Sequence, residues 1–106
     1  MQEATFLILT ALAADTQHGY GILADVAEIS GGRVRLRPGT LYTALDRLRG
    51  DGLIEVDREE IVDGRLRRYY RLTGDGGEQL AAEAARLQAN ARAALARLDL
   101  AGGVAT

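Results

Sequence analysis

The amino-acid sequence predicts a mainly α-helical domain of the α+β class. Apolar residues recur at helical spacing up to Gly50 and again after Thr73, while between them the apolar period falls to two. Asp-Gly pairs at 51–52 and 63–64 mark a helix stop and a tight turn. The 106 residues, 47 % hydrophobic and 26 % charged, have the length and composition of one globular domain.

Two helices are expected in the N-terminal third of the chain. The first covers residues 2–14 and is apolar on nearly every side, so it lies either at the centre of the core or beneath a partner chain. The segment DTQHG interrupts the pattern. A second helix is then expected from about Gln17 to Ile29, ended by Ser30-Gly31-Gly32, which tolerate a left-handed backbone.

The third helix is expected from Pro38 to about Gly50. Proline suits the first helical position, because its missing N–H has no partner to lose there and its φ is already helical. The buried side carries Leu41, Ala44, Leu45 and Leu48. The opposite side and its flanks carry small or hydroxyl-bearing residues at the N-terminal end, followed by an arginine: Gly39, Thr40, Tyr42, Thr43 and Arg47.

A β-hairpin follows the third helix. The first strand begins at Leu53, with Ile54, Val56 and Arg58 on one face, and the second runs from Leu66 to Leu72. Asp63-Gly64 forms the turn, since both residues tolerate a positive φ. Tyr70 is expected to be buried because it lies two residues before Leu72 and therefore on the same face of the strand.

The C-terminal part predicts one long helix over residues 73–100, capped by Thr73, and a disordered tail over 101–106. An apolar seam with coiled-coil spacing follows it, with Leu95 flanking the seam: Leu80, Ala84, Leu87, Ala91, Ala94 and Leu98. The residues expected at the dimer contact are Leu80, Ala84, Leu87, Ala91, Leu95 and Leu98. A helix this long cannot bury a full stripe on so small a body, so the favoured interpretation is a homodimer. The alternative is packing against the first helix of the same chain.

The charge distribution points to a phosphate-binding face. The chain carries −2 overall, yet residues 33–71 hold ten arginines against seven acidic residues, a local charge of +3. Arg33, Arg35 and Arg37 directly precede the third helix, whose N-terminus itself attracts phosphate. Such a local basic zone is what a nucleic-acid-binding surface requires.

Other classes of function find little support in the sequence. There is no cysteine and no pair of nucleophile and base. For the single histidine, His18, capping the second helix or lining a turn is the expected role. We therefore expect neither an enzyme nor a bound metal or cofactor. No apolar run approaches a membrane span and no export leader is visible, so a cytoplasmic protein without membrane contact is expected.

Three helices followed by a two-stranded hairpin is the element order of a winged helix-turn-helix. In that design the third helix enters the major groove of DNA and the hairpin, or wing, reaches the adjacent backbone. Thr40 and Thr43 could then meet base edges, and Tyr42 could contact a phosphate or sugar. The competing interpretation is a winged-helix dimer that binds proteins or small molecules but no operator, which the net acidity favours.

Four segments resemble the PadR family of bacterial transcriptional regulators: TFLILTALA (5–13), HGYGI (18–22), SGGRVRLRPGTLYTALDRLRGDGLIE (30–55) and GRLRRYYRLTGDGGEQL (64–80). The likeness covers almost the whole chain in order. It implies a winged-helix domain over 1–72 and a C-terminal helix that builds a homodimer. It also implies a palindrome-like operator in double-stranded DNA, repression, and a small aromatic effector as a candidate partner. The chain contains no tryptophan on which such an effector would stack.

The resemblance also implies roles for individual residues. The head of the recognition helix would be formed by Pro38, Gly39, Thr40, Leu41 and Tyr42, and Tyr20 would lie near the phosphate backbone. The wing would contribute Arg65, Arg67 and Arg68. Apart from Leu41, which is on the buried side of the helix, these residues and Arg37, Thr43 and Arg47 from the residue pattern make up the predicted DNA-binding set.

Overall fold

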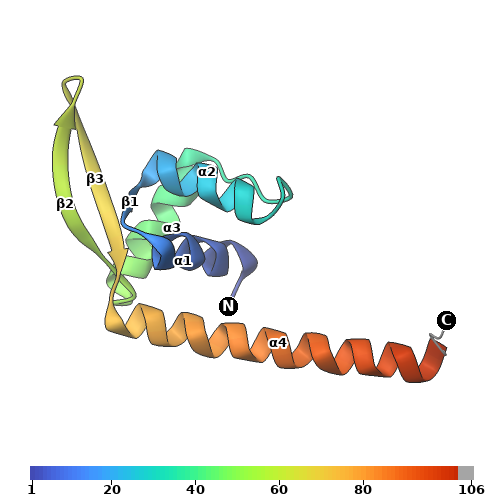
Figure 1. Ribbon diagram of the computed structural model, residues 1–106. Coiled ribbons are helices and arrows are strands. Elements are labelled where there is room, and N and C mark those ends of the chain that lie inside the picture. The colour runs from blue at the N-terminus through green and yellow to red at the C-terminus, as the bar shows by residue number, and fades with distance from the viewer. Residues whose placement is uncertain (103–106) are drawn as a thin grey trace.

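The computed structural model describes residues 1–102, which form four helices and three strands (Figure 1). The elements are α1 (Glu3–Ala14), β1 (Gln17–His18), α2 (Gly19–Ile29), α3 (Pro38–Gly50), β2 (Ile54–Val62), β3 (Arg65–Leu72) and α4 (Gly74–Gly102). The first three helices and the sheet make one body, and α4 runs along α1 and extends well past it (Figure 1). This architecture confirms the predicted α+β winged helix with a long C-terminal helix.

The hydrophobic core is built around α1. Leu7, Ile8, Leu9, Ala11 and Leu12 are buried and pack with apolar residues of α2, α3 and the sheet. Of the two expected positions for this helix, the centre of the core is therefore the observed one. Burial of apolar surface, at roughly 25 cal/mol per Å², is the main force that holds the helices together.

The recognition-helix candidate α3 has the predicted boundaries. Arg37 is its N-cap, with extended backbone, and Pro38 is its first residue. The Leu41 N–H donates to the Arg37 carbonyl at 3.0 Å, so the helical hydrogen bonds begin directly behind the proline. Asp51 closes the helix and Gly52 reverses the chain with a φ of 75°, as expected for a residue that follows a helix end.

The start of α2 corrects the sequence-based prediction, because Gln17 does not open the helix. Gln17 and His18 instead form the short strand β1, which pairs with Tyr70 and Tyr69 of β3 and gives a three-stranded sheet of order β1-β3-β2. His18 Nδ1 accepts a hydrogen bond from the Gly21 N–H at 3.3 Å, so His18 caps the helix, as predicted. Two extended residues are too short to leave a period-two pattern in the sequence.

The hairpin has the predicted Asp63-Gly64 turn, with φ values of 52° and 76°. The alternation predicted for the first strand is wrong beyond Val56. A β-bulge between Val56 and Arg58 shifts the register, so that Arg58 pairs with Tyr69 and its guanidinium lies 4.0 Å above that ring. A bulge adds one residue, and every residue after it changes face.

The junction between the sheet and α4 depends on two small residues. The Thr73 hydroxyl accepts a hydrogen bond from the Gly76 N–H at 3.0 Å, which confirms the predicted cap. Gly76 is buried, and a side chain there would collide with the Leu53 backbone. The helix continues to Gly102, two residues beyond the predicted end. Residues 103–106 of the predicted tail lie outside the described residues.

Candidate nucleic-acid interface

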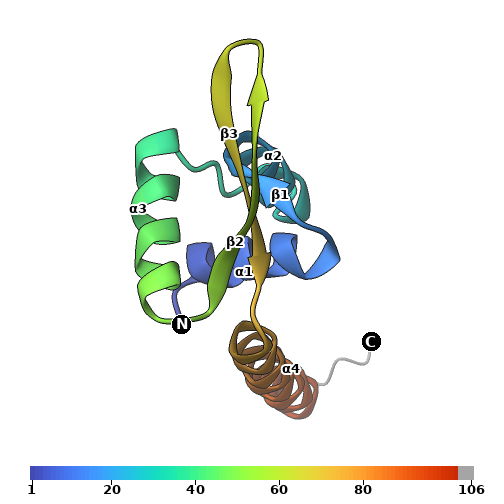
Figure 2. The same cartoon turned by 90° about the vertical axis from the view of Figure 1, so that its left-hand side faces the viewer.

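One face of α3 is buried and the other is exposed, as the pattern predicted. Leu41, Leu45 and Leu48 are inaccessible to solvent. The residues expected to contact DNA on this helix are all exposed: Pro38, Gly39, Thr40, Tyr42, Thr43 and Arg47. In Figure 2 the helix lies beside the hairpin, and the hairpin extends past the N-terminal end of α3.

A groove of about 350 Å³ separates the N-terminal ends of α2 and α3 from the wing. Tyr20 and Tyr42 contribute to the helical wall, while Arg65, Arg67 and Arg68 contribute to the wing wall. Five residues that were predicted to bind DNA, from three separate segments of the sequence, therefore line one surface. The pairing of β1 with β3 anchors the start of α2 against the sheet. This anchoring sets the distance across the groove between the helices and the hairpin.

Tyr42 owes its position to Gly19. A Cβ at residue 19 would collide with the Tyr42 hydroxyl and its ring, so the absence of a side chain lets the phenol lie over the start of α2. Burial raises the pKa of Tyr42, and the nearby Tyr70 and Tyr20 phenols add to that rise. The hydroxyl therefore keeps its proton at neutral pH and is available to donate to a phosphate oxygen.

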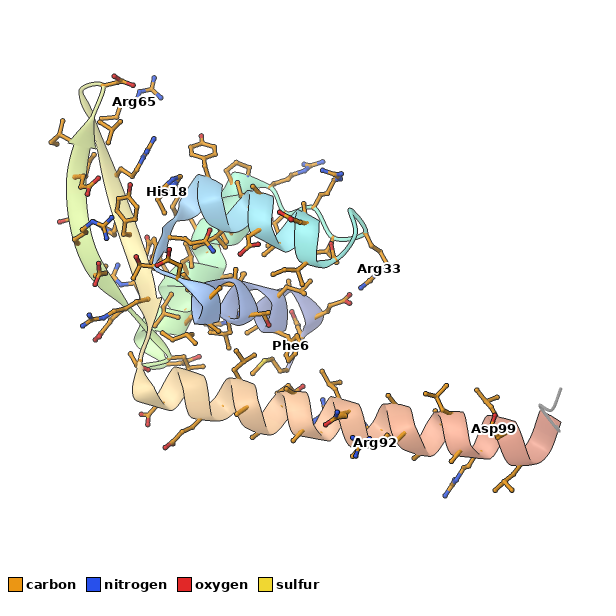
Figure 3. The ribbon with its side chains drawn as sticks, in the orientation of Figure 1. Phe6, His18, Arg33, Arg65, Arg92 and Asp99 are labelled. Atoms are coloured by element: carbon orange, nitrogen blue, oxygen red, sulfur yellow. The ribbon has the colours of Figure 1, made fainter. Side chains whose placement is uncertain are left out.

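The wing arginines differ in their availability. Arg68 donates to Glu59 at 3.0 Å across the hairpin. Arg65 and Arg67 make no ion pair with any of the described residues, and Arg65 lies near the end of the hairpin (Figure 3). An unpaired guanidinium can exchange water for phosphate oxygens without first breaking a salt bridge, so Arg65 and Arg67 are the stronger candidates for backbone contacts.

His18 and Leu66 also line this groove, although neither was assigned to the interface from the sequence. The His18 ring meets the Tyr69 ring edge-on, with centroids 5.3 Å apart. Burial lowers the pKa of His18, and the positive charge of Arg67 lowers it further, so the ring is neutral when it caps α2. The HGYG segment was a signal for His18, but its contact with the wing depends on strand β1, which the pattern did not reveal.

Four further predicted residues of α3 lie around a second hollow, on the side of α1. Gly39, Thr40, Thr43 and Arg47 line it together with the first turn of α1, and its volume is about 390 Å³. The Arg47 guanidinium donates to the Thr5 hydroxyl at 2.9 Å, so this side chain is held against α1. Among the loop arginines, Arg37 is exposed at the helix cap, whereas Arg33 pairs with Glu3 at the end of the body remote from the wing (Figure 3).

The apolar seam of α4 is partly used within the chain. Leu80 packs against the core, and Leu87 borders an apolar hollow of about 270 Å³ that it shares with Phe6 and Leu7 of α1. Beyond this point the seam is open, with Leu95 and Leu98 each 63 % exposed. Ala84 and Ala91 are exposed as well. The intrachain interpretation therefore applies to the first turns of the seam, while the homodimer stays a prediction for the open turns.

No group of side chains suited to hold a metal ion occurs among residues 1–102. Over the same residues, no helix is both long and apolar enough to cross a membrane.

Comparison with known families decides the identity of the chain. The model of the PadR-like family of transcriptional regulators matches residues 8–82. This range begins in the middle of α1 and includes α2, α3, the sheet and the first turns of α4. The chain belongs to this family. PadR-like proteins are DNA-binding regulators rather than enzymes, and this PadR-like protein is a transcriptional regulator.

Individual relatives agree with this assignment. The transcriptional regulator Rv3488 of Mycobacterium tuberculosis is 42 % identical over 84 residues, which cover 78 % of this chain and 75 % of the relative. A PadR family regulator from Clostridium difficile superimposes with a TM-score of 0.78 at 26 % identity, covering 92 % of this chain and 99 % of the other. Bacillus subtilis PadR, solved in complex with operator DNA, gives a TM-score of 0.67 at 25 % identity, covering 76 % of this chain and 46 % of that one.

Proposed function

We propose that this PadR-like regulator binds a specific operator in double-stranded DNA as a homodimer and represses transcription. The observation that carries the proposal is the groove in which Tyr20, Tyr42 and the wing arginines meet beside the exposed face of α3. A helix of this size fits the major groove, and a wing beside it reaches the neighbouring backbone. The operator-bound structure of the Bacillus subtilis relative supports DNA as the partner.

The proposed contacts divide by chemistry. Thr40 and Thr43 read base edges, because their hydroxyls both donate and accept and Gly39 leaves room for close approach. Phosphate contacts come from Tyr20, Tyr42, Arg37, Arg47, Arg65, Arg67 and Arg68, with Pro38 setting the helix end that faces the backbone. The guanidinium of Arg47 is bonded to a neutral hydroxyl, so its charge is still available to a phosphate.

In this proposal residues 1–72 are the DNA-binding unit and α4 is the dimerisation element. Leu98 lies on the predicted coiled-coil seam and Leu95 flanks it, and both are exposed over a stretch that no other part of residues 1–102 covers. A two-fold symmetric dimer presents two recognition helices in inverted orientation, so the operator is an inverted repeat with half-sites about one helical turn apart. A repressor of this kind acts in the cytoplasm on promoter DNA.

Salt dependence of DNA binding tests the phosphate contacts. The probe is the duplex that the unmodified protein selects from a random library, and the readout is fluorescence anisotropy at several salt concentrations. Arg67→Ala should weaken binding and lower the slope of log K against log salt by about one for each phosphate that the variant leaves unneutralised. Arg71→Ala is the matched control, since Arg71 is on the same strand but pairs with Glu55 and Asp57.

The two results have separate meanings. Equal affinities and slopes for the Arg67 and Arg71 variants would remove the wing from the interface. Failure of the unmodified protein to select any duplex, even at low salt, would refute operator binding altogether.

Sedimentation tests the dimer. Leu95→Asp places a charge beside the open part of the seam, and because the Leu95 side chain is 63 % exposed the change is harmless to the folding of one chain. We expect monomers, because two buried carboxylates at a coiled-coil seam cannot be paired. Arg97→Asp, an off-seam substitution on the same helix, should leave the dimer intact. Retention of the dimer by the Leu95 variant would contradict the assigned seam.

A reporter gene under the promoter that contains the selected duplex tests the sign of regulation. We expect lower reporter output when the unmodified protein is present, and restored output with the Leu95→Asp variant. Higher output with the unmodified protein would make it an activator.

A further inference from the structure

Two large apolar side chains are exposed at the end of the wing. Ile61 is 71 % exposed and Leu66 is 60 % exposed. They are direct cross-strand partners, one rung below the last pair, Val62 and Arg65, before the turn. Native hairpins usually protect such ends with charged residues, since exposed apolar strands invite aggregation. An apolar pair at this position therefore needs a partner surface.

The end of the wing lies beyond the recognition helix. Strand β2 has nine residues, so it is roughly 30 Å long at about 3.3 Å per residue. Helix α3 has 13 residues and is only about 20 Å long at 1.5 Å per residue. The two elements are joined at the end of α3 and lie side by side, so the hairpin passes the N-terminus of α3 (Figure 2).

The surroundings of the pair favour DNA as the partner. Leu66 borders the groove that contains Tyr20 and Tyr42, so the pair continues the proposed interface. The adjacent Arg65 and Arg67 have no carboxylate partner among the described residues.

The acidic groups of the wing are largely neutralised. Glu59 forms an ion pair with Arg68 and Glu60 forms one with Arg58, each with a nitrogen–oxygen distance of at most 3.0 Å. Asp63 at the turn is the remaining carboxylate, and the two unpaired arginines outnumber it. The apolar pair is thus flanked by net positive charge, which suits the phosphate rows on either side of a DNA groove.

We propose that Ile61 and Leu66 act as an apolar wedge that enters the minor groove next to the major groove occupied by α3, and bends the operator there. This inference rests on the proposed DNA-binding function and specifies how the wing contributes to it. The minor groove is only about 6 Å wide, too narrow for a two-stranded ribbon. Apolar side chains at the end of such a ribbon fit only if they widen the groove and partly unstack a base step, which kinks the duplex.

The wedge contributes specificity without hydrogen bonds to bases. Unstacking is easiest at flexible pyrimidine–purine steps, so the position under Ile61 and Leu66 should favour TA or CA in the selected duplex. Arg65 and Arg67, which lie on the opposite face of β3 from Leu66, hold phosphates beside the opened step. Base preference would then extend past the positions read by α3.

The test replaces both residues by threonine, in Ile61→Thr/Leu66→Thr, which keeps β-propensity while removing most of the apolar surface. Ile29→Thr is the matched control, because Ile29 is an exposed isoleucine at the end of α2, outside the groove. The probe is the duplex selected by the unmodified protein, labelled at its ends for energy transfer and carrying 2-aminopurine at the flanking step.

We expect the double variant to bind about tenfold more weakly, an effect typical of removing one good groove interaction. The DNA bend and the 2-aminopurine signal should decrease, while the salt slope is unchanged because every phosphate-binding side chain is still present. Leu66→Met, which keeps an apolar side chain, should retain the bend. The Ile29 control should behave as the unmodified protein.

Three outcomes would overturn the wedge. An unchanged bend and affinity in the double variant would refute it and leave operator binding intact. Loss of self-association in sedimentation with unaltered DNA binding would assign the pair to a protein contact instead. If the unmodified protein selects no duplex, the proposed function fails, and the wedge fails with it.

Discussion

Replacement of Gly76 by alanine should destabilise the protein, although alanine is the better helix former. Gly76 lies in the first turn of α4, where the helix crosses the start of β2. A Cβ on this residue would lie 2.9 Å from the carbonyl carbon of Leu53 and 3.3 Å from its Cα, and closer still to its carbonyl oxygen. All three are backbone atoms, so no side-chain rotation can relieve the contact.

The magnitude follows from the displacement required. Carbon atoms pack best at about 3.5–4.0 Å, so α4 must move away from Leu53 by about 1 Å. The Leu53 carbonyl also accepts the Thr73 N–H at 3.1 Å, and this bond would be stretched by the same movement. Overpacking of this kind costs about 3 kcal/mol. The helix propensity of alanine, worth about 1 kcal/mol, offsets only part of that cost.

Gly77→Ala is the matched control. The neighbouring glycine has the same helical setting, but an added Cβ meets no atom within 4 Å outside its own helical turn. It should stabilise the protein by about 0.5–1 kcal/mol. Urea unfolding at fixed protein concentration should therefore separate the two variants by about 3 kcal/mol, or roughly 12 °C in Tm. Equal stability of the two alanine variants would refute the close approach of α4 to Leu53.

Three further predictions concern the groove and the helix caps. Gly19→Ala should leave folding nearly unchanged but displace the Tyr42 phenol, and anisotropy should show weaker DNA binding than for the unmodified protein; equal affinity would mean that the phenol position is unimportant. Thr73→Ala removes the cap of α4 and should cost about 1 kcal/mol in urea unfolding, whereas Thr73→Ser should restore most of it. His18 has a pKa below its ordinary value of 6.5, so the unfolded chain binds the proton more tightly, and stability should fall as the pH drops below about 6.5. His18→Asn keeps a capping acceptor without a titrating group, and its stability should lose that part of the pH dependence.

Much of the candidate site followed from local patterns. The boundaries of α3 were predictable because Pro38 and Asp51-Gly52 act on the backbone within one turn. The exposure of Thr40 and Thr43 followed from the helical period alone. The meeting of Tyr20 with the wing arginines could not be predicted in this way, because it requires the pairing of β1 with β3. That pairing spans more than 50 residues and leaves no trace in two residues of sequence.

The exposed end of the wing shows the same division. The turn at Asp63-Gly64 was evident from residue type, since both residues adopt a positive φ. Which strand residues were covered depended on the bulge beside Val56, which changes the face of every later residue in β2. The pairing of Ile61 with Leu66 at an exposed position could therefore be known only from the register.

Sequence alone was sufficient for the order of the elements, the helix and turn signals, and the buried face of α3. These features depend on interactions between residues a few positions apart, so their physical cause is contained in short segments. Tertiary structure determined the shape of the groove and the position of the Tyr42 ring against Gly19. It also determined the close contact of Gly76 with Leu53 and which part of the α4 seam is covered. Each of these depends on which surfaces meet when the chain is compact, a property that no short segment encodes.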